Sequence, residues 1–234
     1  MQRILTVFLI FISLGLFSQN QTESLYNYTT DVYGIDDVLV NGGIYTSIHP
    51  VANVDPFLGG NIFTQGYLNL QGREYAEVFL KYDIEQQKLV LKGFTDTDKY
   101  EVIALNYNYI KSFSIHDKQF VNITHLLQTN SLGGFYELIY SGSFVFVKYY
   151  TKEFIGTYSN KYPHGKYSET KVDNFLIIDN TKTSIKRKKD LFKVFPEHKD
   201  LIKKYIKENK IKFRKASNES FNNLMQYCDE VSGN

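Results

Sequence analysis

The feature that most constrains the fold is an alternation of apolar and polar residues between positions 74 and 84. Apolar side chains occupy every second position: Ala76, Val78, Leu80, Tyr82 and Ile84. Charged residues take the positions between them, with Phe79 as the one exception. Successive side chains of a strand point to opposite faces, so this period of two predicts a β-strand with one face buried and one in solvent.

Similar segments follow along the chain. Strand-like runs occupy 67–70, 88–92, 100–105, 111–115, 120–123, 135–140, 143–150, 175–179 and 183–186. The dipeptides at 71–72 and 141–142 each contain a glycine between two such runs, which favours tight hairpins. The chain is rich in Tyr and Phe, which suit strands. The sequence therefore predicts a mainly β (α+β) fold, with an antiparallel meander over 61–186 forming a barrel or a sandwich.

The period changes to that of a helix after residue 186. Phe221, Leu224, Met225 and Cys228 are spaced as one helical stripe, and Ser217 is placed to cap that helix. We expect residues 187–234 to form a basic helical appendage of the same domain, with two or three helices packed on the sheet. Cys228, the only cysteine, is interpreted as a small buried apolar residue and not as a nucleophile.

The first residues predict export. Arg3 precedes the uncharged apolar run Ile4–Leu16, and the chain turns polar at Ser18. That run would span roughly 20 Å as a helix, less than the bilayer core of about 30 Å. We interpret 1–18 as a signal peptide and 19–60 as a loop-rich segment with short strands. No cysteine stands directly after the apolar run, so a lipoprotein anchor is not expected.

The meander resembles a known group of sequences. The stretch 71–84 followed by 88–90 is similar to the G-x-x-Y…L-x-Y-D…L-V pattern of uncharacterised exported β-rich proteins of the Bacteroidota. The segments 189–196, 205–210 and 224–228 are also similar to the C-terminal ends of that group. The resemblance covers about 61–227 and implies a periplasmic or extracellular location in a diderm bacterium. It implies no activity.

Motifs for catalysis or for cofactors are absent from the sequence. It contains no G-x-S-x-G, H-E-x-x-H, C-x-x-C or phosphate-binding glycine loop, and no two histidines share a metal-ligand spacing on one helix. The sequence thus predicts no catalytic, metal or cofactor residues. The loop around His164 is the most site-like stretch, because Tyr162 and Tyr167 flank an imidazole that could meet a sugar or an anionic group. A surface turn explains the same residues.

Charge is distributed unevenly. Residues 182–215 contain fourteen Lys or Arg and four acidic residues, although the whole chain carries only +2. Lys186, Arg187, Lys188 and Lys189 form the densest basic run. Each cation near an anionic membrane contributes about 1 kcal/mol, so the run could contact anionic lipid weakly. A solvated helix face is the simpler interpretation, and export disfavours a nucleic-acid partner.

Three functions remain open from the sequence. The first is a non-enzymatic binding or structural module of the cell envelope, whose partner is another envelope protein or a small ligand. The second is a carrier that encloses a small apolar ligand in a barrel cavity. The third is a hydrolase whose site is assembled from distant residues, such as His164 with a carboxylate.

Overall fold

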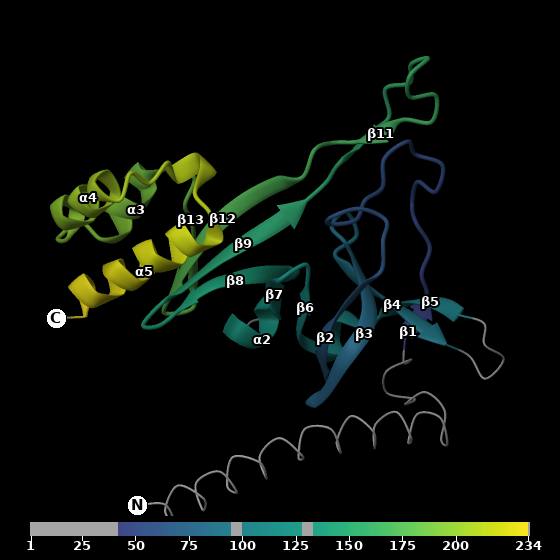
Figure 1. Cartoon of the computed structure of the whole chain (residues 1–234), viewed down its shortest axis with the longest axis horizontal. Helices are drawn as coiled ribbons and strands as arrows, with labels where there is room; N and C mark the ends of the chain where they lie inside the picture. The colour runs from purple at the N-terminus through teal and green to yellow at the C-terminus, as the bar shows by residue number, and fades with distance from the viewer. Residues whose placement is uncertain (1–41, 95–99, 128–132, 234) are drawn as a thin grey trace, which may run out of the picture.

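Figure 1 shows a computed structural model that describes residues 42–94, 100–127 and 133–233. The expected signal peptide at 1–18 and residues 19–41 of the loop-rich segment lie outside the described residues. Among the described helices, none combines the length and the apolar character needed to span a bilayer.

One large antiparallel sheet dominates the described chain. Its strands, in chain order, are β1 (Gly42–Ile44), β2 (Thr64–Leu70), β3 (Arg73–Asp83), β4 (Lys88–Phe94), β5 (Tyr100–Leu105), β6 (Ile110–Ile115), β7 (Lys118–Asn122), β8 (Phe135–Ser141), β9 (Val145–Thr151), β12 (Lys171–Ile178) and β13 (Thr181–Ser184). The spatial order is β1-β5-β4-β3-β2-β6-β7-β8-β9-β12-β13. β10 (Phe154–Ile155) and β11 (Lys166–Tyr167) form a separate pair.

The strand order consists of two meanders that diverge from β2. One runs from β3 to β5 and ends at β1, and the other runs from β6 to β13. β1 and β13 are the two edges and do not pair with each other, so the sheet is open. The helices are α2 (Ile123–Leu127), α3 (Lys188–Val194), α4 (Lys199–Glu208) and α5 (Asn218–Ser232). The prediction of a mainly antiparallel β fold with helices packed at its C-terminal end is confirmed.

A β-bulge changes the face that the start of β3 presents. Glu77 has a φ of 59°, and the pairing of β2 with β3 shifts between Gly66 and Leu68. Tyr75 is therefore buried and Ala76 is exposed, so the expected inward orientation of Ala76 was wrong. An extra residue in one strand reverses the alternation upstream of it, and the apolar pattern alone does not locate such a residue.

The expected solvent face of β3 is also partly covered. Asp83 is fully buried and Lys81 is only 9% exposed. The Tyr45 hydroxyl donates to Asp83 (2.8 Å), and the ammonium group of Lys81 lies 4.2 Å from the centre of the Phe57 ring. The loop-rich segment before β2 thus packs over β3, and it supplies polar partners that make the burial of these charges tolerable.

The sheet core contains a cluster of packed aromatic rings among aliphatic side chains. Tyr82, Phe113, Phe120 and Phe135 are fully buried, and the centres of their rings lie 4.8 to 5.8 Å apart wherever two of them are in contact. The Tyr82 hydroxyl donates to the side-chain oxygen of Gln87 (2.5 Å), so its polar end is satisfied inside the core. These separations are the usual ones for packed aromatic pairs.

A second core lies under the helices. Figure 1 shows α3, α4 and α5 gathered at the end of the sheet formed by β8, β9 and β12. Their apolar faces bury Leu191, Phe195, Ile202, Ile206, Phe221, Leu224 and Cys228 against the sheet. The predicted stripe that contains Phe221, Leu224 and Cys228 is thus confirmed. Burial raises the pKa of the Cys228 thiol to about 12, so the residue acts as an apolar side chain. α2 covers the opposite face, where Ile123 and Leu127 contact a third, smaller cluster.

The expected strand at 120–123 was one residue too long, because Ile123 starts α2. In α4, Ile202 and Ile206 are the buried residues, and Leu201 is 48% exposed. Pro196 precedes α4 by three residues.

Asp229 holds the hairpin between β8 and β9 against α5. Its carboxylate accepts hydrogen bonds from the Tyr140 hydroxyl (2.5 Å), the Ser143 backbone N–H (3.0 Å) and the Ser143 hydroxyl. These donors favour the charged form and lower the pKa of Asp229 below its usual value of 3.8. Burial, together with the hydrogen bond to this carboxylate and its charge, raises the pKa of Tyr140 to about 12.

We predict that Asp229→Ala lowers the free energy of unfolding by about 1.5–3 kcal/mol at pH 7, since hydrogen bonds to a charged group are lost. Because the pKa of Asp229 is lower in the folded protein than in the unfolded chain, the charged carboxylate stabilises the fold above pH 3.8. This stabilisation is lost as the pH falls through the folded-state pKa. Urea unfolding at several pH values should therefore show the difference from wild type shrinking below pH 4. Glu169→Ala, at an exposed position, should show no such convergence, and a pH-independent difference for Asp229→Ala would contradict the role given to its charge.

Candidate functional site

Cationic side chains line a hollow between the start of α3 and the 3-10 turn η2 (Phe213–Lys215). We call it the basic groove; its volume is about 620 Å³ and its lining residues are Arg187, Lys188, Lys189, Ile211, Lys212, Phe213, Arg214 and Lys215. Six of these residues are cationic and none is acidic. All six cationic residues are exposed. An anion entering the groove would therefore meet positive charge alone on its lining.

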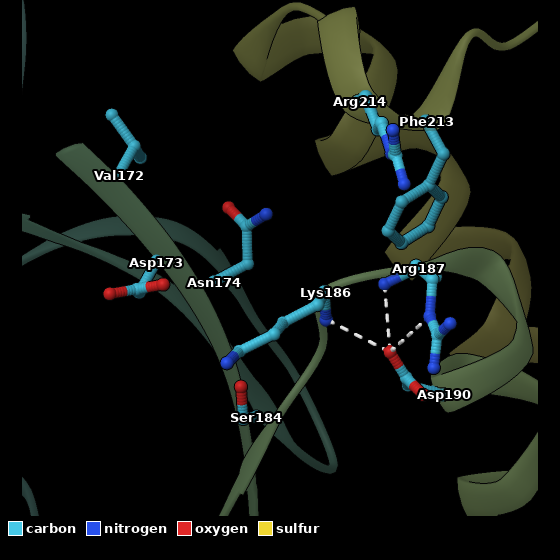
Figure 2. A pocket seen from close by; sticks show the side chains of 9 residues that line it. All are labelled: Val172, Asp173, Asn174, Ser184, Lys186, Arg187, Asp190, Phe213 and Arg214. Atoms are coloured by element: carbon cyan, nitrogen blue, oxygen red, sulfur yellow. Dashed lines mark hydrogen bonds and ion pairs between the residues drawn. The ribbon is translucent and has the colours of Figure 1, made fainter.

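Asp190 fixes the start of α3 beside the basic groove. Its carboxylate accepts hydrogen bonds from the backbone N–H groups of Arg187 (2.8 Å) and Lys186 (3.2 Å), and it lies 3.9 Å from the Arg187 guanidinium (Figure 2). Asp190 is the third residue of α3, where a carboxylate favours the helix start. Asp190 therefore fixes the backbone of the basic run at Lys186 and Arg187. The cap position itself is occupied by Arg187.

The other wall comes from a segment about 25 residues further along the chain. In η2, Phe213 is buried and its ring packs edge-on against Phe221 of α5, with 5.1 Å between the ring centres. Arg214 and Lys212, on either side of this anchor, are exposed. The buried ring thus fixes the turn, and the cations beside it are left free to meet a ligand.

A second hollow adjoins the basic groove on the side of the sheet. We call it the polar pocket; its volume is about 680 Å³ and its lining residues are Val172, Asp173, Asn174, Ser184, Lys186, Arg187, Asp190, Phe213 and Arg214. Figure 2 shows its sheet side formed by β12 and its helical side by the start of α3 and η2. Arg187, Phe213 and Arg214 line both hollows, so the two share part of their walls.

Beneath the polar pocket lies a buried polar cluster that holds α5 on the sheet. Lys148 of β9 pairs with Asn174 of β12, and its ammonium group donates to the side chain of Asn218 (2.5 Å) at the start of α5. Asn218 in turn donates to Glu137 of β8 (2.7 Å). The same ammonium lies 5.2 Å from the centre of the Phe221 ring, against which Phe213 packs. The cluster therefore positions η2 through α5.

Glu137 is the centre of this cluster and is only 1% exposed. Besides the bond from Asn218, it accepts hydrogen bonds from Lys118 (2.8 Å) and from the Tyr150 hydroxyl (2.5 Å). Burial lowers the pKa of Lys148, an effect that the nearby Glu137 charge opposes. Burial and the hydrogen bond to Glu137 raise the pKa of Tyr150, so its proton is held.

The residues predicted as a site do not all converge. Lys186, Arg187, Lys188 and Lys189 lie on the groove or the pocket. His164 is exposed, and within the described part of the chain it forms no ion pair with a carboxylate. The ring of Tyr162 lies 4.6 Å below the ammonium group of Lys166.

Tyr167 packs against His49, although the sequence placed it beside His164. It is buried, donates to Glu85 (2.5 Å) and lies edge-on to His49, which stacks on Phe154 at 3.5 Å. Burial and the Glu85 contact raise the pKa of Tyr167 above its usual range. This packed contact joins β11 to the segment before β2, and we interpret it as structural.

Sequence reasoning missed Lys212, Arg214, Lys215 and Asn174 as site residues. The sequence did contain a usable pattern at 212–215, where Phe213 stands between basic residues. An apolar residue among cations can be buried and hold those cations at the surface. Across 42–94, 100–127 and 133–233, no group of three or more His, Cys, Asp or Glu residues is arranged to hold a metal. No protein-family model, curated protein or solved structure matches the chain.

We predict that Glu137→Ala lowers the free energy of unfolding by about 3–5 kcal/mol, because Lys118, Tyr150 and Asn218 lose a buried acceptor. Glu101→Ala, at an exposed position of β5, should change it by less than about 0.5 kcal/mol. Urea unfolding followed by circular dichroism measures both. Similar small losses in the two variants would show that the cluster contributes little.

Proposed function

We propose that this chain is an exported cell-envelope protein that acts as a non-enzymatic binding module for an anionic ligand. The basic groove carries the proposal, because six of its lining residues, from two separate segments, are cationic and none is acidic. Folding such residues together costs electrostatic self-repulsion, which an anionic partner would relieve. The predicted signal peptide supports export, as does the resemblance to exported Bacteroidota proteins.

The packing of the sheet supports a binding module over a carrier. An enclosed ligand would need an open interior, and the sheet core is occupied by Tyr82, Phe113, Phe120 and Phe135. The groove lies instead on the surface beside the helices, where a ligand can enter without opening the fold. Arginine in the groove wall favours oxyanions, because its planar group binds carboxylate or phosphate through two parallel hydrogen bonds.

We predict that the double substitution Lys212→Glu and Arg214→Glu weakens binding of inorganic tripolyphosphate by about tenfold or more, since two charge-assisted contacts become repulsive. Isothermal titration calorimetry on the mature protein measures this. Binding to the wild type should also weaken as salt is raised from 50 to 300 mM, because exposed charges are screened.

The matched control is the pair Lys203→Glu and Lys207→Glu on α4. Both residues are exposed and lie outside the groove, and the pair changes the net charge by the same amount. The control should retain nearly all of the affinity. Equal losses in the two double variants would show that net charge alone attracts the anion, and absence of tripolyphosphate binding by the wild type would overturn the proposal.

A further inference from the structure

The polar pocket differs in chemistry from the basic groove that it joins. Its lining residues carry both signs of charge: Asp173 and Asp190 stand beside Lys186, Arg187 and Arg214, together with the uncharged Asn174 and Ser184. Asp173 forms an ion pair with Lys171 (3.2 Å). A ligand that carried negative charge over its whole length would place part of that charge near Asp173. The pocket is therefore suited to a group that is polar and uncharged.

Asn174 supplies an independent observation. Its side-chain oxygen is buried and has no hydrogen-bond partner among the described residues. Figure 2 shows the amide pointing off β12 into the space that Phe213 and Arg214 face. Polar atoms that are buried in proteins almost always have a partner, so an orphan of this kind lining a pocket marks a position for a ligand group.

The amide can serve a hydroxyl in either direction. The terminal torsion of Asn is broad and roughly two-fold, so a half-turn exchanges the positions of its oxygen and its NH₂ group. A hydroxyl both donates and accepts, and it can therefore pair with Asn174 in either orientation. Ser184, which pairs with Phe175 in the β12–β13 ladder, also lines the pocket and carries a hydroxyl that can donate and accept.

Arg187 and Arg214 line both hollows, so a single ligand could span them. Its carboxylate would lie against the arginines, and the hydroxyls next to it would enter the polar pocket. A volume of about 680 Å³ falls in the range of pockets that bind small molecules. We infer that the ligand is an acidic saccharide, in which carboxylates alternate with hydroxyl groups, and this rests on the proposed anion-binding function.

The test compares two anions on the same protein by calorimetry. Trigalacturonate carries carboxylates and hydroxyls, and tripolyphosphate carries charge without hydroxyls. We expect the wild type to bind trigalacturonate more tightly at equal salt, and to lose this binding when the probe is replaced by its uncharged methyl ester. Tighter binding of tripolyphosphate would overturn the inference.

Substitution of Asn174 separates the inference from the proposed function. Asn174→Ala should weaken trigalacturonate binding by about tenfold, the effect of one lost hydrogen bond, and leave tripolyphosphate binding unchanged. Asn222→Ala, an exposed amide on α5, is the matched control and should change neither. Ser184→Ala, at an exposed edge position, provides a second variant should Asn174→Ala fail to fold.

The outcomes are distinguishable. If Asn174→Ala and Ser184→Ala both bind trigalacturonate as the wild type does, while tripolyphosphate still depends on Lys212 and Arg214, the saccharide inference is wrong and the anion site stands. If wild-type protein binds neither anion, the proposed function fails together with the inference.

Discussion

The rest of the structure depends on one buried carboxylate. Glu137 lies on the face of the sheet between the aromatic sheet core and the core under the helices, and it accepts hydrogen bonds from Lys118, Tyr150 and Asn218. These donors come from two strands and a helix, so a single side chain ties β7, β9 and α5 together. Removing one partner from such a group leaves the others buried and unpaired, which is far more costly than losing a surface contact. The position of α5, and through Phe221 that of η2, therefore follows from this charge being satisfied.

The sheet core and the core under the helices meet along β9. Alternate residues of β9 place Phe146 under the helices, Lys148 in the middle and Tyr150 in the sheet core. One continuous face therefore carries two apolar regions with a polar band between them. The aromatic rings lie in the sheet core, while α3, α4 and α5 cover the second core and leave their basic sides in solvent. The groove is thus supported from below by packed rings and ion pairs, although its own cations are exposed.

The sequence predicted those parts of the fold that depend on local periodicity. The alternation in β3 and the stripe containing Phe221, Leu224 and Cys228 were enough to identify a strand and a helix, because each pattern reflects one buried face. The bulge at Glu77 and the burial of Lys81 and Asp83 were not predictable, because they depend on which segment covers β3. The same reason applies to the site: Lys186 to Lys189 stood out as a charge run, but only the packing of Phe213 brings Lys212 and Arg214 beside them. Asn174 gave no signal at all, since its importance lies in a missing partner.

Every residue that lines the basic groove and the polar pocket lies between positions 172 and 215. The sheet core is built almost wholly from residues before that interval, and it has no side chain in either hollow. Most lining residues are exposed, so exchanging them removes little packing. Under the proposed binding function, substitutions in this short interval would therefore change ligand preference while the scaffold keeps its stability.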